Sequence, residues 1–290
     1  MGLIDFILNV AGLLLWLNWR AIRFDPFTRA TPATLAGTLK RAEPPRVSRW
    51  HFLTALGGLL LARAIFYGLI GPEANWTPRI NLGVVALPFP LAHRGHVFFL
   101  SALLFSALSF ARTLMVFYFW LLAVASINRS VAEPDRFQKM LLLQLGRAGR
   151  WPRMVQAVLP LLAVAALWIA LHPLLVSAGI TSRVQSYAHL VEQGLLAGLG
   201  LYFSLKFLLP AFLFVHLIAC YVYLGNSPLL DFIGTTAHHL LAPLRRLPLR
   251  LGRVDFAPVV GMVLILLLLH ALPDFIVGKL GEMKLNLWPQ

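Results

Sequence analysis

Three cationic side chains lie inside long apolar runs of this sequence, namely Arg63, Arg112 and Lys206. Because a charge in hydrocarbon is costly, an intramembrane cation marks by default a functional path or an internal ion pair. Asp5, in another apolar run, is the candidate partner of Arg63. Arg112 and Lys206 lie about 9 Å along a helix from the expected outer edge of their spans, so their long side chains can reach the interface. Two interpretations stay open: an anion or lipid-headgroup path, and snorkelling or pairing.

Histidines within the apolar runs could hold a cofactor. Two facing imidazoles can bind a haem iron, and His172, His216 and His270 are the candidates. His216 and His270 are expected at different depths, which argues against a haem shared between them and favours hydrogen-bonded packing. The neighbours His238 and His239 would point about 100° apart on a helix, which disfavours a shared metal. We therefore expect no cofactor and no metal, and keep a haem-handling protein as an alternative.

The composition is typical of a protein that crosses a membrane several times. Of 290 residues, 59% are hydrophobic and 12% are charged, about half the charged fraction of a soluble domain. The single cysteine, Cys220, excludes a disulfide within the chain and a cysteine metal site. The first residues show no basic segment followed by a cleavage site, so no removable signal peptide is predicted.

The distribution of lysine and arginine along the chain indicates its membrane topology. The net charge is +14, which alone could suggest nucleic-acid binding. Most lysines and arginines, however, gather in three segments, Arg20–Arg49, Arg129–Arg153 and Arg245–Arg253, which alternate with loops that hold few. This is the positive-inside pattern, and such segments also contact anionic phospholipid headgroups. We predict contact with phospholipid and no nucleic-acid partner.

Six apolar segments are long enough to cross a bilayer as helices. They are Leu3–Trp19, Phe52–Ile70, Val97–Ile127, Val155–Ile180, Leu190–Leu224 and Ala257–Gly278. Basic segments follow the first, third and fifth, which places both termini outside, in the periplasm if the membrane is a bacterial inner membrane. The third and fifth segments exceed one upright span, so we expect tilting or an interfacial first part, with Pro210 kinking the fifth. Gly194 with Gly198, and Gly57 with Gly58, predict close helix contacts.

A recurring sequence pattern predicts that the chain consists of repeats of one unit. An apolar run ends at a residue followed by proline, then come mixed residues, a basic cluster and another apolar run. The three pairs are Asp25-Pro26, Glu133-Pro134 and Ser227-Pro228. The predicted units cover about 1–71, 97–180 and 190–279 within a single membrane domain. The predicted fold is all-α, with about six transmembrane helices in three tandem helix–in-plane helix–helix units.

Amphipathic stretches in the second and third units predict helices that lie in the headgroup plane with their apolar side down. In the third unit, Asp231, Thr235 and His239 lie outside an apolar stripe of Leu229, Ile233, Ala237, Leu240, Leu241 and Leu244. In the second unit, Arg136, Lys139 and Gln144 lie opposite an apolar stripe of Phe137, Met140, Leu141 and Leu145. The stretch in the first unit, from Thr31 to Leu39, carries Pro32 and is weaker.

The third basic segment leads into the last span. Asp255 is expected near the cap of that helix, where its carboxylate can accept from free backbone N–H groups, with Pro258 in the first turn. The arginines expected at headgroup level are Arg245, Arg246, Arg250 and Arg253. One interpretation is a helix cap with snorkelled arginines. The other is a docking surface for an acidic segment of a partner or for phospholipid headgroups.

The third unit resembles the YggT family of integral membrane proteins, also called the YlmG or CCB3 type. The matching motifs are Ser227-Pro228-Leu229, Ala242-Pro243-Leu244-Arg245-Arg246 and Gly252-Arg253-Val254-Asp255-Phe256-Ala257-Pro258. Ser227 stands where the family has Asn, Ala257 where it has Ser, and the Arg and Ser-Trp of the preceding family helix are missing. The resemblance covers Tyr221 to Ala271. It implies a small inner-membrane protein without known catalytic activity, whose relatives are associated with cell division, envelope homeostasis and cytochrome haem assembly.

Catalytic motifs are missing from the sequence: it has no HExxH, no P-loop and no glycine-rich dinucleotide turn. We expect a non-enzymatic scaffold or assembly subunit that binds another membrane protein or complex, without catalytic residues. One alternative is a channel or transporter that uses Arg63, Arg112 and Lys206 as a path for an anion or a lipid headgroup. The other alternative is the haem-handling protein.

Overall fold

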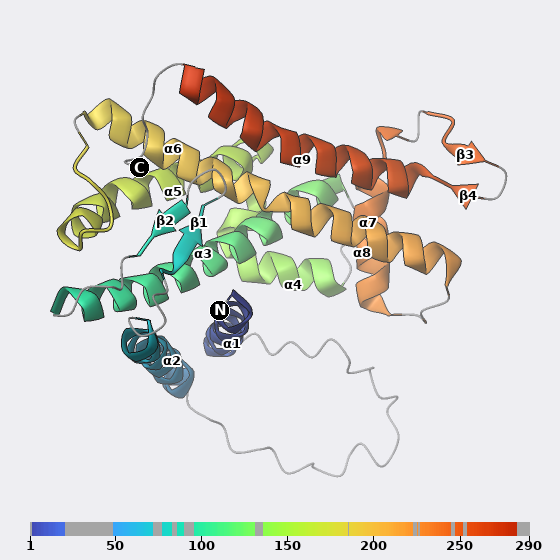
Figure 1. Cartoon of the computed structure of the whole chain (residues 1–290). Helices are drawn as coiled ribbons and strands as arrows, with labels where there is room; N and C mark the ends of the chain where they lie inside the picture. The colour runs from blue at the N-terminus through green and yellow to red at the C-terminus, as the bar shows by residue number, and fades with distance from the viewer. Residues whose placement is uncertain are drawn as a thin grey trace, which may run out of the picture.

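The structure is a computed structural model, which describes residues 2–20, 49–71, 77–82, 86–89, 96–130, 136–184, 186–222, 225, 227–244, 247–251 and 254–282. This part of the chain is almost entirely helical (Figure 1). The long helices are α1 (Gly2–Trp19), α2 (Arg49–Ile70), α3 (His96–Ile127), α5 (Arg153–Ser177), α6 (Tyr187–Phe203), α7 (Leu205–Tyr221) and α9 (Ala257–Glu282).

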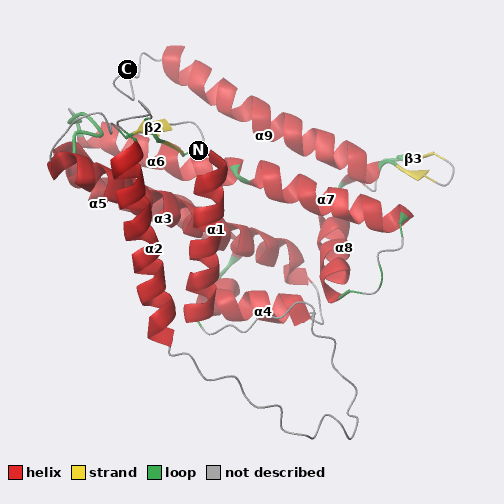
Figure 2. Cartoon of the chain, turned by 60° about the horizontal axis from the view of Figure 1, so that its bottom comes forward, coloured by secondary structure: helices red, strands yellow, loops and turns green. Residues whose placement is uncertain are grey.

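Shorter elements connect the long helices (Figure 2). The helical connections are η2 (Asn128–Ser130), α4 (Arg136–Leu145), η3 (Gly146–Arg150) and α8 (Pro228–Leu240). Two antiparallel hairpins pair β1 (Arg79–Asn81) with β2 (Ala86–Pro88), and β3 (Arg250–Leu251) with β4 (Val254–Asp255).

Six helical segments of the described chain are long and apolar enough to cross a membrane. They are Gly2–Trp19, Arg49–Ile70, Phe99–Ile127, Arg153–Ser177, Tyr187–Tyr221 and Ala257–Ile276. Each overlaps one of the six segments predicted from the sequence, so the all-α class and the multi-pass membrane architecture are confirmed. The predicted order of helix, short helix and helix is present as α3–α4–α5 and as α7–α8–α9. The proposed short helix of the first unit, Thr31 to Leu39, lies outside the described residues.

Contacts along the helices show which of them run in the same direction. Asn9 of α1 bonds to Ser109 of α3, and Trp16 further along α1 bonds to Tyr118 further along α3. These two helices are therefore parallel. α2 runs the opposite way, because Tyr67 near its end packs on Phe105, in the first part of α3, at a ring distance of 5.8 Å. A chain that crosses a bilayer at every span requires this alternation.

The bundle has two distinct ends. We call the end formed by α4 and α8 the platform end; there Phe137 stacks on Phe232 with ring centroids 6.0 Å apart. We call the opposite end the hairpin end, because β1 and β2 pack into it. At the hairpin end, Leu87 and Phe89 join a core with Tyr67, Phe105 and Leu175, so the hairpin links α2, α3 and α5.

The amphipathic stripes of α4 and α8 are partly as predicted. Ile233, Ala237 and Leu241 of the α8 stripe are buried, but Leu229 is 40% exposed. On α4, Gln144 was expected on the polar side and is buried. α4 packs on α8 and η3 as well as on α3. Its polar side is therefore partly covered by protein, which the sequence of one helix does not reveal.

The long fifth segment breaks at Ser204, between α6 and α7, and its predicted kink at Pro210 lies inside α7. At the break, the Ser204 N–H donates to Leu201 O and the Phe207 N–H donates to Ser204 O, each at 3.1 Å. These are short-range bonds of the kind that tightens helix ends. The Ser204 hydroxyl also accepts from Trp120 Nε1 of α3 at 2.9 Å, which ties the break to the core.

Two glycines hold α6 close to α5, as predicted. A Cβ atom added at Gly198 would lie 2.8 Å from Leu161 O, and one added at Gly194 would lie 3.1 Å from Ala165 Cα. The obstacles are backbone atoms, so they cannot rotate away. The prediction for Gly57 and Gly58 is wrong within the described part of the chain, where nothing lies within 4 Å of a Cβ added at either.

Gly198→Ala and Gly58→Ala form a matched pair of substitutions with opposite expected effects. Gly198→Ala forces α5 and α6 apart and should lower the free energy of unfolding by about 1–3 kcal/mol. Gly58→Ala meets open space and should leave it unchanged or raise it by up to about 1 kcal/mol, because alanine favours a helix. Thermal unfolding in detergent, followed by circular dichroism, measures both. Equal melting temperatures for the two variants would contradict the close α5–α6 contact.

Candidate functional site

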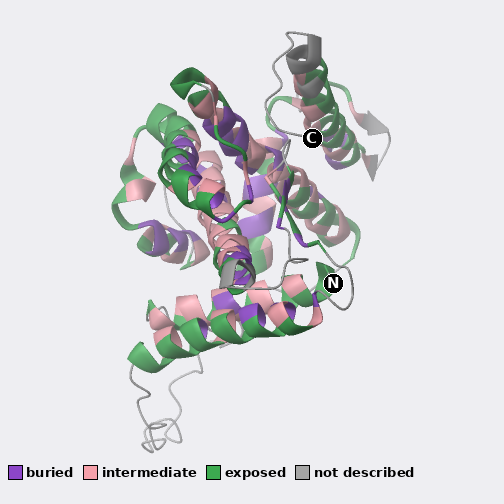
Figure 3. Ribbon diagram, turned by 60° about the vertical axis from the view of Figure 1, so that its left-hand side comes forward, coloured by how far each residue is buried: buried purple, intermediate pink, exposed green. Residues whose placement is uncertain are grey.

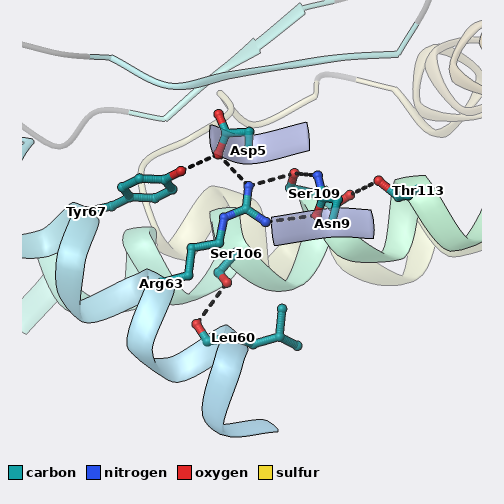
Figure 4. A network of polar contacts seen from close by, with 8 residues as sticks. All are labelled: Asp5, Asn9, Leu60, Arg63, Tyr67, Ser106, Ser109 and Thr113. Carbon is teal, nitrogen blue, oxygen red and sulfur yellow. Dashed lines mark hydrogen bonds and ion pairs between the residues drawn. The ribbon is translucent and has the colours of Figure 1, made fainter. Parts of the chain in front are cut away.

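A polar cluster surrounds Arg63 where α1, α2 and α3 meet (Figure 4). Arg63 is 3% exposed, and its Nη2 lies 2.7 Å from Asp5 Oδ1. The same nitrogen donates to Ser109 Oγ at 3.0 Å, and Nη1 donates to Asn9 Oδ1 at 2.9 Å. Four of the guanidinium's five N–H groups sit on these two nitrogens, so the fork is directed at oxygens from both neighbouring helices.

The surroundings of the cluster complete the charge balance. The Tyr67 hydroxyl donates to Asp5 Oδ1, the oxygen that also faces Arg63. The Arg63 guanidinium carbon lies 5.5 Å from the centroid of the Tyr67 ring and 5.2 Å from that of Phe105, within the range of cation–π attraction. Next to the cluster, the Ser106 hydroxyl donates to Leu60 O and joins α3 to α2 again. The charge of Arg63 is thus neutralised within the protein.

The sequence indicated Asp5 as the partner of Arg63, and the structure shows that ion pair. Sequence reasoning missed Asn9, Ser109 and Tyr67. Asn9 follows Asp5 by one helical turn, and Tyr67 follows Arg63 by one turn, so both share a helix face with a charged residue. That spacing was the available signal. A buried cation whose Nη1 and Nη2 both have partners joins three helices and is not free to bind a passing anion.

The other two intramembrane cations are placed differently. Arg112 is exposed and forms no ion pair with the described residues. It borders a cavity of about 50 Å³ whose other lining residues are all apolar, among them Leu108 and Met115 of its own helix. Lys206 is half-buried, with its Nζ atom 5.3 Å from the centroid of the Phe207 ring. The three cations lie on α2, α3 and α7. The contacts described for them have no polar residue in common.

The C-terminal basic segment is described only in part. Arg245, Arg246 and Arg253 lie outside the described residues, and Arg250 belongs to strand β3. Asp255, at the end of β4, accepts from the Ala257 N–H at 3.0 Å. Its carboxylate therefore satisfies the first free N–H of α9, as the helix-cap interpretation predicts. Pro258 follows in the first turn of the helix.

A second buried network joins the elements of the platform end. Asn128, 1% exposed, donates from Nδ2 to Thr236 Oγ1 at 2.7 Å, and its Oδ1 lies 3.2 Å from His239 Nδ1. Gln138 Nε2 donates to Asn128 O at 2.8 Å. Since these residues come from η2, α4 and α8, the network fixes both short helices to the end of α3. The sequence placed His239 on the polar side of α8 and gave no hint of its partner.

The candidate haem histidines lie apart. His216 of α7 faces α8, because a Cβ added at Gly234 would lie 3.9 Å from His216 Nδ1, and its Nε2 lies 3.8 Å from Cys220 Sγ. His172 lies near the other end of the bundle, with its ring 6.1 Å from that of Trp168. His270 is exposed on α9. His172 and His216 therefore cannot hold one haem between them. The described residues contain no group of three or more His, Cys, Asp or Glu side chains that could hold a metal ion.

No protein-family model, curated protein or solved structure shows significant similarity to this sequence. The resemblance of the third unit to the YggT family therefore stays a prediction, carried by the residues quoted for it.

Loss of Arg63 should damage the fold much more than loss of Arg112. Arg63→Met leaves the Asp5 carboxylate without its counter-charge, and breaking one partner of a buried pair costs about 3–5 kcal/mol. Arg112→Met removes a charge without a described partner and should cost less than about 1 kcal/mol. Urea or thermal unfolding in detergent measures both. The double variant Asp5→Leu with Arg63→Met should recover most of the loss. Equal stabilities of the two single variants would rule out the structural role of the ion pair.

Proposed function

We propose that this protein is a non-enzymatic scaffold or assembly subunit of a bacterial inner membrane, which binds another membrane protein or complex through its spans. The supporting observation is a ridge of small residues on the outward side of α2. Thr54, Gly58 and Ala62 recur at intervals of four, and all three are exposed. Residues at this spacing lie in one line along a helix. We call this line the α2 small-residue face.

Small residues in a line let another helix approach closely in lipid, where dispersion contacts and weak hydrogen bonds replace the hydrophobic effect. The chain contains an example of such an approach in the contact of Gly194 and Gly198 with α5. Beside the α2 small-residue face, Leu61 and Ile65 are 48% and 50% exposed and can pack on either side of a docked helix. Figure 3 shows that exposed residues continue along the outward sides of the long helices.

The interior of the bundle favours a scaffold over a transport path. The charge of Arg63 is used to hold α1, α2 and α3 together. Asn128 in turn holds α4 and α8 to the end of α3. A frame fixed by buried polar contacts at both ends presents its outer faces in a constant arrangement, which suits the binding of a partner. The resemblance of the third unit to the YggT family, whose members have no known catalytic activity, agrees with this proposal.

Phospholipid is the second proposed partner. The basic segments alternate along the sequence, and in the proposed topology they face the cytoplasm, where anionic headgroups attract lysine and arginine. The described parts of the second segment, η2, α4 and η3, belong to the platform end. In this orientation the platform end is cytoplasmic, and both termini are periplasmic.

The partner should dock on the α2 small-residue face. Wild-type protein and Gly58→Leu and Gly278→Leu variants are extracted into lipid nanodiscs, and associated proteins are quantified by mass spectrometry. Gly278 is also exposed, with no described residue within 4 Å of an added Cβ, and serves as the matched control. Gly58→Leu should reduce a stoichiometric partner about 10-fold, since overpacking costs ~1–3 kcal/mol. Isolation of wild-type protein as a lone monomer would reject the proposal.

The proposed topology has its own test. With Cys220 replaced by alanine, single cysteines are introduced as Ser182→Cys, in the α5–α6 loop, and Arg150→Cys, in η3; both positions are exposed. A membrane-impermeant maleimide should label Ser182→Cys on intact cells, and Arg150→Cys only after permeabilisation. The reverse pattern would place the basic segments outside and contradict the positive-inside assignment.

A further inference from the structure

A cavity of about 760 Å³ lies between the end of α5 and the start of α6, at the hairpin end of the bundle. Figure 1 shows the loop that joins these two helices there. The volume is within the usual range for sites that bind small molecules and far exceeds what a simple ion needs. Neither the frame around Arg63 nor the α2 small-residue face contributes a residue to its lining.

His172 is the most informative residue of this cavity. It is 8% exposed, and neither Nδ1 nor Nε2 has a hydrogen-bond partner among the residues that the structure describes. A buried polar group without a partner costs free energy, and such groups in folded proteins are rare. Asn128 and Arg63, which are buried to a similar degree, have partners in the protein. The ring of His172 lines the cavity, and its two nitrogens have almost no accessible surface, so a rotation of the ring brings one of them to a ligand that can supply the missing partner.

Arg183 adds a charge to the same lining. Its side chain is exposed and forms no ion pair with the described residues. Ser177 ends α5 and Ser186 caps α6 at the same level of the cavity as Arg183. The Ser177 hydroxyl donates to Leu174 O, so the Ser186 hydroxyl, which accepts from the Ala188 N–H, is the one that can donate to an anion. The N-terminus of α6 also points its positive dipole end toward this level. Together these groups suit an anion, and guanidinium matches the oxygens of a phosphate ester.

The rest of the lining is apolar and lies along the spans. Ile169 and Pro173 of α5 and Leu190 of α6 belong to it. His172 lies on α5 between Ile169 and Pro173, about 7.5 Å along the helix from Ser177. Pro173 has no N–H group, so the Ile169 carbonyl lacks its usual helical donor and is a further acceptor beside the cavity. A ligand that fills both levels needs a phosphate, then polar linking groups, then an apolar tail.

We propose that this cavity binds a glycerophospholipid, with the phosphate at Arg183, the glycerol and ester groups at His172, and the acyl chains along Ile169, Pro173 and Leu190. The cavity opens at the end of two spans, which is the depth of phospholipid headgroups. The ligand chemistry, a phosphate ester, could also come from a free phosphate compound. The apolar part of the lining favours the lipid, because a water-soluble phosphate leaves it without contacts.

Four probes distinguish a phospholipid from a free phosphate compound as the ligand. Each is tested on the full-length protein in a non-ionic detergent. They are dihexanoyl-phosphatidylglycerol, dihexanoylglycerol, glycerol 3-phosphate and inorganic phosphate, each titrated while melting temperature and native mass spectra are recorded. The short-chain phospholipid should bind at least 10-fold more tightly than each of the other three. Equal binding of glycerol 3-phosphate or phosphate would assign the site to a free phosphate compound and overturn the lipid. Equal binding of dihexanoylglycerol would overturn the recognition of phosphate.

Two variants assign the binding to this cavity. Arg183→Gln removes the charge that bonds to the phosphate of the ligand in the proposed complex. The substitution should weaken phospholipid binding about 10- to 100-fold. Arg79→Gln, an exposed arginine of β1 at the same end and outside the lining, is the matched control and should bind as wild type. His172→Phe should also weaken binding at least fivefold, without lowering the melting temperature in the absence of phospholipid, because no hydrogen bond within the protein is lost. Unchanged binding in Arg183→Gln, or the same loss in Arg79→Gln, would overturn the proposal.

Discussion

A guanidinium group inside an apolar bundle must be neutralised by the protein, and the arrangement of α1, α2 and α3 follows from that requirement for Arg63. Its counter-charge, Asp5, comes from α1, while Ser109 comes from α3. The fork of donors in arginine is rigid, so all three helices must keep their register for the contacts to form. Gly12 permits this register, because a Cβ there would lie 2.9 Å from the Phe110 ring. The ion pair therefore sets the positions of the helices as well as their contact.

The two ends of the bundle are closed in different ways. At the platform end, Asn128 and Gln138 connect short helices through hydrogen bonds that are shielded from solvent. At the hairpin end, the connection is apolar, since Ile80 and Leu87 alternate with exposed neighbours and point into the core. A strand segment at the end of a span is tolerated where protein covers its backbone. The cavity beside His172 lies at the hairpin end.

The sequence predicts the spans well because length and hydrophobicity alone decide whether a helix can cross a bilayer. It predicts the contacts between them poorly. Apolar residues occur on every side of α3, so its sequence does not show that Ser109 faces Arg63 while Arg112 faces elsewhere. Both α2 and α6 carry glycines, yet Gly198 meets a backbone and Gly58 meets open space among the described residues. Proline at position 210 stays within α7, and the break comes at Ser204. Which face of a helix is covered depends on its neighbours.

The candidate sites of this protein are of two kinds. In one, the buried polar group has hydrogen-bond partners among the described residues; in the other, it has none. Arg63 is satisfied on all sides but its Nε atom, so its removal would affect folding first and any ligand second. Within the described part of the chain His172 has no partner for either ring nitrogen, so these residues gain nothing in stability from its polarity. Because an apolar side chain of the same shape would cost less in that position, the presence of imidazole there needs a reason outside the bundle. A ligand that reaches the cavity from the membrane supplies one, and the same ligand brings an anion to Arg183.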